Sequence, residues 1–348
     1  MEVFLGVLFH AIGGFASGSF YIAYKKVQSW SWESYWLAGG VFSWLLAPLV
    51  FGLLTVPHLF DVLAQSPATV RGWVYFWGVM WGFGGLTFGL AMRYLGMSLG
   101  MAVALGFCAV FGTIVPPIWQ GELGKLLALA SGVVILSGLA VCVIGILICG
   151  KAGMMKENEL SASDKKAAVP EFDLRKGLLV AVFSGIMSAC FSFGLTAGQP
   201  IAAIAVGNGA DELYMNNAIL VILLLGGLTT NAVWTIYLNL KNKTYTDYTD
   251  RKTPIARNLV FCALAGVTWY LQFFFYGMGD SKMGDYRFSG WTLHMAFIIV
   301  FSSLWGLYFK EWKGTGKATM RTILLGIGIV IFSTIIVGFG NYLASEGK

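Results

Sequence analysis

Charged residues are scarce in this sequence: Asp, Glu, Lys and Arg together make up 11% of its 348 residues. A water-soluble domain carries about a quarter charged residues, so this count excludes an ordinary soluble protein. Hydrophobic residues make up 57% of the chain, and its mean hydropathy is +0.73. The composition therefore predicts a polytopic membrane protein that folds within a lipid bilayer.

Motifs for catalysis or nucleotide hydrolysis are also missing. The chain has no P-loop, no HExxH or other zinc-binding spacing, and no ordered set of Ser, His and Asp. It also lacks a potassium-filter sequence and an arginine-rich voltage-sensing helix. We therefore expect no enzymatic activity, no cofactor and no metal site.

Cysteine is present, but in no reactive pattern. All five cysteines lie inside apolar runs, and none stands in a CxxC or similar spacing: Cys108, Cys142, Cys149, Cys190 and Cys262. We interpret them as small core residues and not as disulfides or metal ligands.

Long apolar runs divide the chain into ten expected membrane-spanning segments. Their ranges are 2–24, 33–56, 72–92, 97–120, 124–150, 176–199, 213–238, 257–279, 290–309 and 318–343. The interval 151–175 mixes Lys, Glu, Ser and Asp and is too charged to span. We predict an all-α membrane protein with two five-helix halves, 1–150 and 176–348, joined by a polar linker at 151–175. Halves with an odd number of helices, if duplicated, form inverted repeats, which are typical of transporters.

Basic residues give the chain a net charge of +6 and a pI of about 9.0, which at first suggests a nucleic-acid partner. They flank the apolar runs, however, so no nucleic-acid partner is expected. Of the 23 Lys and Arg residues, 18 lie on the connections after the odd-numbered segments. The positive-inside rule places these connections in the cytoplasm and both termini in the periplasm. The start shows no signal-peptide features, so we expect the first segment to be retained.

One stretch, Gly266–Tyr276, combines aromatic rings with an amide inside an apolar run. At helical spacing, Trp269, Gln272 and Tyr276 fall on one face. An unpaired amide in lipid is costly, so this face should look inward, at other helices or at a watery cavity. Rings beside an amide suit a pyranose sugar. The alternative is aromatic packing between helices, with Gln272 paired to a neighbour.

Two histidines and one carboxylate are candidate proton carriers. The first segment has a polar stripe on one face, formed by His10, Gly14, Ser17 and Tyr21. A histidine at membrane depth can contact a proton or a substrate, or can stay neutral and bond to a facing helix. His294 lies near the outer end of the ninth segment. Glu33 lies at the cytoplasmic start of the second segment, where it could merely cap the helix.

Other polar residues are assigned smaller roles. No Asp or Glu is expected at mid-depth, and we place Asp280 and Asp285 in the outer loop after the eighth segment, with a coupling role disfavoured. Asn231 should face protein, and Asn216 could line an outer vestibule. Serines at steps of four along the sixth segment are interpreted as packing contacts: Ser184, Ser188 and Ser192.

Five stretches of the chain resemble the bacterial L-rhamnose–proton symporters of the drug/metabolite transporter superfamily. They are Phe20-Tyr21 followed by Lys25-Lys26-Val27 and Trp30-Ser31-Trp32-Glu33; Met92 to Ser98; Trp269 to Tyr276; Leu293-His294-Met295; and Lys310-Glu311-Trp312. The similarity runs in register from the first segment to the tenth.

The resemblance implies ten helices in two inverted five-helix repeats, a central site open alternately to each side, and proton-driven uptake of L-rhamnose across the bacterial inner membrane. We predict that the sugar is bound by Trp269, Tyr270, Gln272, Tyr276, Tyr21 and Asn231. The predicted proton-coupling candidates are His10, Glu33 and His294. The chain departs from enterobacterial members at 83–88, Thr196 and Gln199, so a related deoxysugar or pentose is an alternative substrate.

Two other functions remain as alternatives. An aromatic-rich cavity would also suit an exporter of amphipathic drugs or metabolites. A membrane enzyme or a non-transporting sensor is disfavoured, because the chain lacks a mid-membrane carboxylate, a metal cluster and a soluble domain. The fifth and tenth segments are bland Leu, Ile, Val and Gly helices, which we interpret as packing helices that could form a homodimer face.

Overall fold

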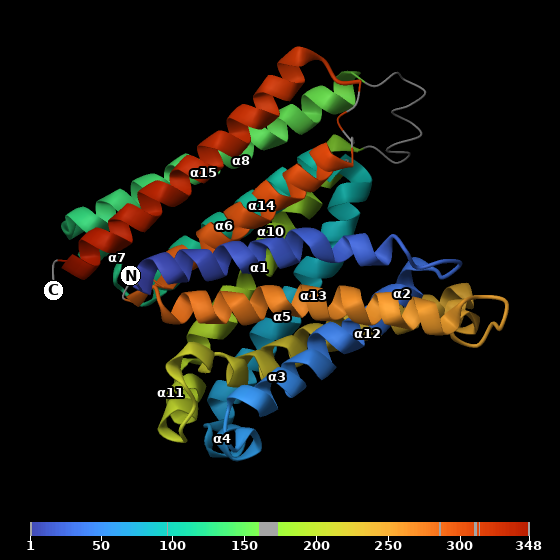
Figure 1. Cartoon of the computed structure of the whole chain (residues 1–348), viewed down its shortest axis with the longest axis horizontal. Coiled ribbons are helices and arrows are strands. Elements are labelled where there is room, and N and C mark those ends of the chain that lie inside the picture. Colours follow the sequence, from blue (N-terminus) through green and yellow to red (C-terminus); the bar gives the residue numbers. More distant parts are fainter. Residues whose placement is uncertain are drawn as a thin grey trace.

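The computed structural model describes residues 2–95, 97–159, 173–284, 287–309, 312 and 314–346 as a bundle of helices (Figure 1). No strand occurs within these ranges. Nine of the helices found there are long and apolar enough to cross a membrane. The predicted all-α membrane fold is confirmed. Asp285, Lys310, Glu311 and much of the predicted linker, 160–172, lie outside the described residues.

The first half has long helices joined by short ones. Their bounds are α1 (Glu2–Tyr24); α2 (Trp32–Val41), the π-helical turn η1 (Phe42–Leu46) and α3 (Ala47–Thr55) in one run; α4 (Leu59–Gln65); α5 (Ala68–Leu95); α6 (Met97–Trp119); α7 (Leu123–Ala128); and α8 (Ala130–Glu159). In α6 only Val103–Trp119 counts as an apolar helix, and it is shorter than the nine candidate spans. The predicted segment 97–120 is therefore not one of the nine.

The second half also has long helices joined by short ones. Its elements are α10 (Leu174–Ala197), α11 (Gln199–Gly207), η2 (Glu212–Tyr214), α12 (Asn217–Asn242), η3 (Thr244–Tyr248), α13 (Ile255–Ser281), α14 (Arg287–Tyr308) and α15 (Lys317–Glu346). Helices α10 and α11 meet at Gly198, directly before Gln199 and Pro200. Helix α13 extends two residues beyond the predicted end at 279.

The two halves pack on each other through matching pairs of helices. Helix α1 lies along α13 and α14, and in the other half α10 lies along α5 and α6. Helices α8 and α15 pack along each other at one side of the bundle (Figure 1). The fifth and tenth predicted segments are thus packing helices, as expected.

Small residues allow the helices to approach closely. Gly78 of α5 lies against the backbone at Leu223 and Gly226 of α12, and Gly82 lies against Thr230. A side chain at either glycine would overlap these atoms, so Gly78 and Gly82 allow α5 and α12 to pack closely.

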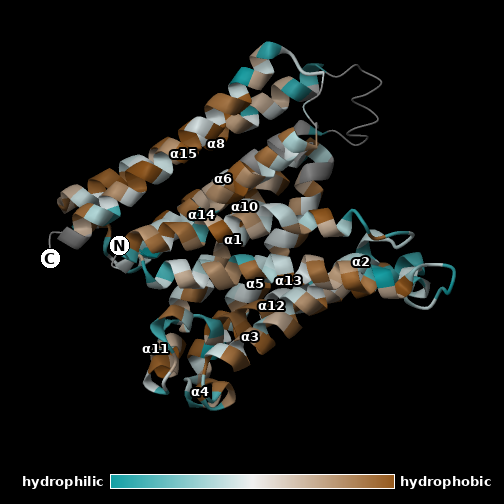
Figure 2. Cartoon of the chain, viewed as in Figure 1, coloured by the Kyte–Doolittle hydropathy of each residue, from teal (hydrophilic) through white to brown (hydrophobic). Residues whose placement is uncertain are grey.

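Large apolar side chains cover the outer surface. Leu54, Leu179 and Trp119 are all strongly exposed on long helices or at their ends. Figure 2 shows hydrophobic colour along the helices and hydrophilic colour gathered at the connections on the two ends of the bundle. This distribution is expected when the surrounding solvent is lipid.

We call the end that carries both chain termini the terminal end, and the other the opposite end (Figure 1). The terminal end holds the last turn of α13 and the first turn of α14. The opposite end holds the start of α2 and the end of α12. Helix α13 separates Asn258 from Asp280 by about 33 Å along its axis.

Candidate functional site

A cavity of about 270 Å³ lies at the terminal end. Its volume is close to the lower bound of small-molecule pockets, about 300 Å³. Its walls come from the C-terminal ends of α6, α10 and α13 and from the starts of α11 and α14. The lining residues that carry polar atoms or rings include Ser192, Thr196, Gln199, Tyr276, Asp280, Arg287 and Trp291. Rings and hydrogen-bonding groups therefore face a single space.

Trp291 is held firmly in the cavity wall. Its indole N–H donates to the carbonyl of Cys108 at 3.0 Å. Gly112 leaves room for the indole, because a Cβ there would overlap the ring. The ring of Phe191 lies nearly parallel to that of Trp291, with centroids 5.8 Å apart. The indole face is thus fixed in position before any ligand binds.

Tyr276 joins the cavity to a pair of buried histidines. Its ring centroid lies 5.1 Å from that of His10 and 5.3 Å from that of His294. The two imidazole centroids are 6.1 Å apart, and both rings are at most 1% exposed. Within the described part of the chain, no ring nitrogen of either histidine has a hydrogen-bond partner. His10, Tyr276 and His294 therefore lie together in the interior of the protein.

Three glycines make room for the imidazoles. A Cβ on Gly279 or Gly290 would overlap His10, and one on Gly13 would crowd His294 and the backbone carbonyl of Gln272. Because of these glycines, α1, α13 and α14 meet at backbone distance. The two unpaired imidazoles are therefore enclosed on several sides.

A carboxylate, a guanidinium and an amide line the cavity, and a second amide, that of Asn216, lies next to the carboxylate. Asp280 Oδ2 accepts a hydrogen bond from Asn216 Nδ2 at 3.0 Å. Arg287 Nη1 donates to Gln199 Oε1 at 2.9 Å, which ties α14 to α11. Asp280 is 6% exposed and belongs to the last turn of α13. Its predicted place in an outer loop is wrong, because α13 continues past 279 and turns the carboxyl into the cavity.

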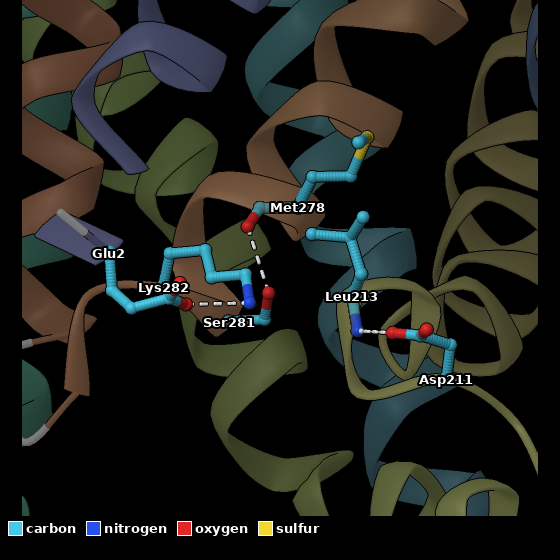
Figure 3. A network of polar contacts seen from close by, with 6 residues as sticks. All are labelled: Glu2, Asp211, Leu213, Met278, Ser281 and Lys282. Carbon is cyan, nitrogen blue, oxygen red and sulfur yellow. Dashed lines mark hydrogen bonds and ion pairs between the residues drawn. The ribbon is translucent and has the colours of Figure 1, made fainter. Parts of the chain in front are cut away.

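Lys282 is paired elsewhere. Its Nζ lies 2.7 Å from Glu2 Oε2, and Figure 3 shows this ion pair next to the end of α13. The hydrogen bond that Lys282 donates to Glu2 raises the pKa of Lys282, so its ammonium stays charged at neutral pH. In the same view Asp211 accepts from the Leu213 N–H at 2.8 Å. These surface charges do not bond to Asp280.

Trp269 lies deeper in the bundle, away from the cavity. Its ring stacks on Phe20 with centroids 4.9 Å apart and an angle of 13°. Trp36 and Trp44 approach it at 5.3 and 5.2 Å. Trp269 is therefore part of a dense aromatic cluster. For Trp269, the alternative of aromatic packing between helices describes the observed contacts.

Gln272 lies between this cluster and Tyr276. It is 3% exposed, and its Nε2 has no hydrogen-bond partner among the described residues. The alternative in which a neighbour pairs its N–H₂ group is not realised there. A buried amide with unpaired hydrogens is costly unless a ligand or water satisfies it.

Tyr270 and Asn231 face other parts of the protein. Tyr270 is fully buried against Phe51, with ring centroids 5.1 Å apart. Asn231 accepts from the Trp36 indole at 3.1 Å and donates to the Gly227 carbonyl at 2.9 Å. Asn231 faces protein, as predicted, and neither residue lines the cavity.

Tyr21 and Glu33 lie toward the opposite end. Tyr21 is 43% exposed, with its hydroxyl 3.3 Å from that of Tyr35. Glu33 Oε1 accepts from Asn242 Nδ2 and Thr244 Oγ1, both at 2.9 Å. The structure thus separates these two residues from His10 and His294.

Of the lining residues, sequence reasoning predicted only Tyr276 as a site residue. Trp291 and Arg287 were not singled out, although Trp291 precedes His294 by three residues and shares its helix face. Ser192 was interpreted as a packing residue, and it does donate to the Gly112 carbonyl at 2.8 Å, but it also lines the cavity. Gln199 was noted only as a departure from the resembling sequences.

Known proteins that are similar to this chain are named as sugar symporters, which agrees with the predicted class of function. The model of one protein family, described as "L-rhamnose-proton symport protein (RhaT)", matches residues 1–344. A protein of Pectobacterium carotovorum subsp. carotovorum (strain PC1) named L-rhamnose-proton symporter is 36% identical over 346 residues, which cover 97% of this chain and 98% of that one. Proteins of the same name from Cronobacter sakazakii (strain ATCC BAA-894) and Yersinia pestis (strain Pestoides F) are also 36% identical, over 340 and 342 residues. These cover 97% of this chain, and 97% and 98% of the two relatives.

Proposed function

The chain belongs to the L-rhamnose-proton symport protein family, and on that premise we propose that it carries L-rhamnose inward with a proton across the bacterial inner membrane. The observation that carries the proposal is the cavity at the terminal end, where rings and hydrogen-bonding groups face one space. Related deoxysugars or pentoses are the other candidate substrates. No observation favours an amphipathic exporter.

Each part of the sugar has a suitable partner in the cavity. Tyr276 and Trp291 offer ring faces and edges for the apolar C–H face and the methyl group. Ser192, Thr196 and Gln199 offer hydroxyls and an amide for the sugar hydroxyls. A neutral sugar needs no charged partner, so the charged lining residues Glu122, Asp280 and Arg287 are available for other roles.

The other predicted sugar contacts lie beyond the cavity. Gln272 lies one helical turn before Tyr276 on α13. Its unpaired N–H₂ group can donate to a sugar oxygen. We propose that Trp269, Asn231 and Tyr21 line the path toward the opposite end and meet the sugar after the site switches. Tyr270 faces Phe51 and is the least favoured of the predicted contacts.

Two inverted repeats of five helices would provide the switch. The exchangeable packing of α1 with α13 and of α10 with α5 supports this arrangement, with α6 as the tenth span. It is also consistent with the drug/metabolite transporter superfamily. With both termini in the periplasm, as the basic residues indicate, the cavity faces outward. We retain the divisions 1–150, 151–175 and 176–348, and a homodimer through α8 and α15, as parts of this proposal.

Among the three predicted proton carriers, position favours the histidines. His10 and His294 contact Tyr276, which lines the cavity. Glu33 is bonded to Asn242 and Thr244 at the opposite end. A proton and a sugar that enter together should bind near each other, so Glu33 is better placed to hold that end closed.

Purified protein in proteoliposomes tests the proposal. With an inward-directed proton gradient, labelled L-rhamnose should accumulate, and a protonophore should abolish the accumulation. A panel of other deoxysugars, pentoses and lipophilic amines added as competitors identifies the preferred substrate. Failure of L-rhamnose and of every related sugar to accumulate would reject the proposal.

A further inference from the structure

We infer that Asp280 is the group that binds the transported proton, an assignment that rests on the proposed function. Asp280 is a carboxyl in the last turn of α13, 6% exposed, and it forms part of the cavity wall. It was not among the predicted carriers. An ionisable side chain in a membrane-spanning segment is costly, and such residues commonly mark ion pathways.

Asp280 forms no direct ion pair in the described part of the chain, although the charge of Arg287 acts on it across the cavity. Within the described ranges no Lys, Arg or His atom lies within ion-pair distance of its carboxylate. Arg287 shares the cavity but donates to Gln199, and Lys282 is paired with Glu2. A buried carboxylate of a purely structural pair would be expected to hold its cation directly.

The titratable and charged groups that surround Asp280 come from every adjacent element. They are Tyr276 on α13 itself, His10 on α1, Arg287 and His294 on α14, Asp211 and Glu212 before α12, Glu122 after α6, and the Lys282 and Glu2 pair. Of these, Tyr276, Glu122 and Arg287 line the cavity with Asp280. Water in the cavity therefore reaches Asp280 directly, whereas the two imidazoles lie behind Tyr276.

The amide of Asn216 suits both protonation states of Asp280. Its Nδ2 donates to Asp280 Oδ2 at 3.0 Å and to the Gly277 carbonyl at 3.2 Å. Its Oδ1 is buried with no partner in the described part of the chain. A charged Asp280 carboxylate accepts the hydrogen bond from Asn216 Nδ2. When the carboxylate takes up H⁺ to become a carboxylic acid, the new O–H can donate to the free amide oxygen.

Protonation also removes the main obstacle to closure. If the walls close over the sugar, a charged Asp280 loses its cavity water without a paired cation, which is strongly unfavourable. A neutral Asp280 loses far less. The proton and the sugar thus favour the same closed form, which is the thermodynamic basis of coupling. On the cytoplasmic side the acid returns H⁺ to water and becomes a carboxylate again.

The variant Asp280→Asn tests the assignment, with Asp211→Asn as a matched control. Asp211 is an exposed carboxylate at the same end that does not line the cavity. In proteoliposomes, Asp280→Asn should lose gradient-driven accumulation of L-rhamnose by at least about 10-fold. It should keep counterflow, the exchange of labelled for unlabelled sugar, which needs no net proton movement. The control should keep both.

Three results would overturn the assignment. Asp280→Asn could accumulate sugar like the unmodified protein, it could lose counterflow and sugar binding together while still folded, or His10→Gln alone could show the uncoupled behaviour. Failure of the unmodified protein to bind or exchange any sugar rejects instead the proposed function on which the assignment rests.

A second measurement tests the assignment even if the Asp280→Asn variant does not fold. In weakly buffered detergent solution, L-rhamnose binding by the unmodified protein should take up protons. The conservative Asp280→Glu should keep this uptake, with a shifted pH profile. Sugar binding without proton uptake in the unmodified protein, or an unshifted pH profile in Asp280→Glu, contradicts the assignment.

Discussion

The two ends of the bundle differ in how their polar groups are satisfied. At the opposite end, Glu33 accepts from Asn242 and Thr244, and Asp247 accepts from the Ser34 hydroxyl at 2.7 Å. At the terminal end the polar groups border a cavity and several buried atoms have no partner among the described residues, including those of His10, His294, Gln272 and Asn216. Hydrogen bonds hold the opposite end together, although the Trp30 indole N–H there has no partner among the described residues, and the terminal end has more unused bonding capacity.

This contrast shows where a ligand is needed. Each bond at the opposite end contributes about 0.5–1.5 kcal/mol, so a few of them hold that end closed without locking it permanently. Unpaired buried groups at the terminal end cost free energy that sugar or water can recover. An alternating-access transporter requires one such end at a time.

The largest expected effect comes from filling the space of Gly112. In Gly112→Ala the new methyl overlaps the Trp291 indole and should push it into the cavity. Overpacking costs about 1–3 kcal/mol, and L-rhamnose binding should be lost in a thermal-shift assay. The matched control is Gly85→Ala, because a Cβ at Gly85 meets nothing within 4 Å. Equal binding by both variants would mean that the Trp291 wall is not part of the site.

Gln272→Ala should weaken sugar binding strongly. Loss of its unpaired N–H₂ group leaves a sugar oxygen without a donor, at a cost of about 1–3 kcal/mol or roughly 5–150-fold in Kd. Isothermal titration with L-rhamnose measures the change, and circular dichroism checks the fold. If affinity stays the same in a folded variant, Gln272 does not contact the sugar.

A moderate effect is expected at the opposite end. Thr244→Val removes one donor to Glu33 and should loosen the closed end by about 0.5–1.5 kcal/mol, or roughly 2–10-fold in population. Hydrogen–deuterium exchange of the first turn of α2 and of η3 should become faster. The control is Thr246→Val, whose hydroxyl, within the described ranges, donates to the nearby Lys243 carbonyl on an exposed turn. Unchanged exchange in Thr244→Val would deny that this network closes the end.

The smallest effect concerns a third bonded carboxylate at the opposite end. Hydrogen bonds from Thr319 Oγ1 and the Gly316 N–H lower the pKa of Glu159. Because the folded-state pKa is lowered, the stabilisation is present above the unfolded-state pKa of about 4.3 and is lost as the pH falls through the folded value. In Thr319→Val the pKa should rise toward its ordinary value, measured by carbon NMR of labelled Glu. No rise would show that the Thr319 bond is not formed.

Hydropathy was enough to predict the long helices, because a helix that crosses lipid requires a long apolar run. The spacing of His10 and Tyr276 also indicated inward-facing polar groups, and the structure brings them together with His294. Helix ends were less certain, and an error of two residues at the end of α13 moved Asp280 out of its helix. Adjacent residues were a second difficulty: Trp269 and Tyr270 differ by about 100° around the helix, so they contact different neighbours.

Pairs formed between distant segments could not be predicted. Arg287 and Gln199 are 88 positions apart, and Asp280 and Asn216 are 64 apart. Periodicity within one helix carries no information about which other helix it meets. The cavity depends on these pairs and on the space left at Gly112, so its walls emerged only from the three-dimensional packing.

Thiol labelling at Thr196 tests most directly the claim that the cavity at the terminal end is the sugar site. All five native cysteines are buried, so a Thr196→Cys variant supplies one accessible thiol. In intact cells, a membrane-impermeant maleimide should label this variant from outside, and L-rhamnose should slow the labelling. No labelling from outside, or labelling that L-rhamnose and related sugars leave unchanged, would contradict the account.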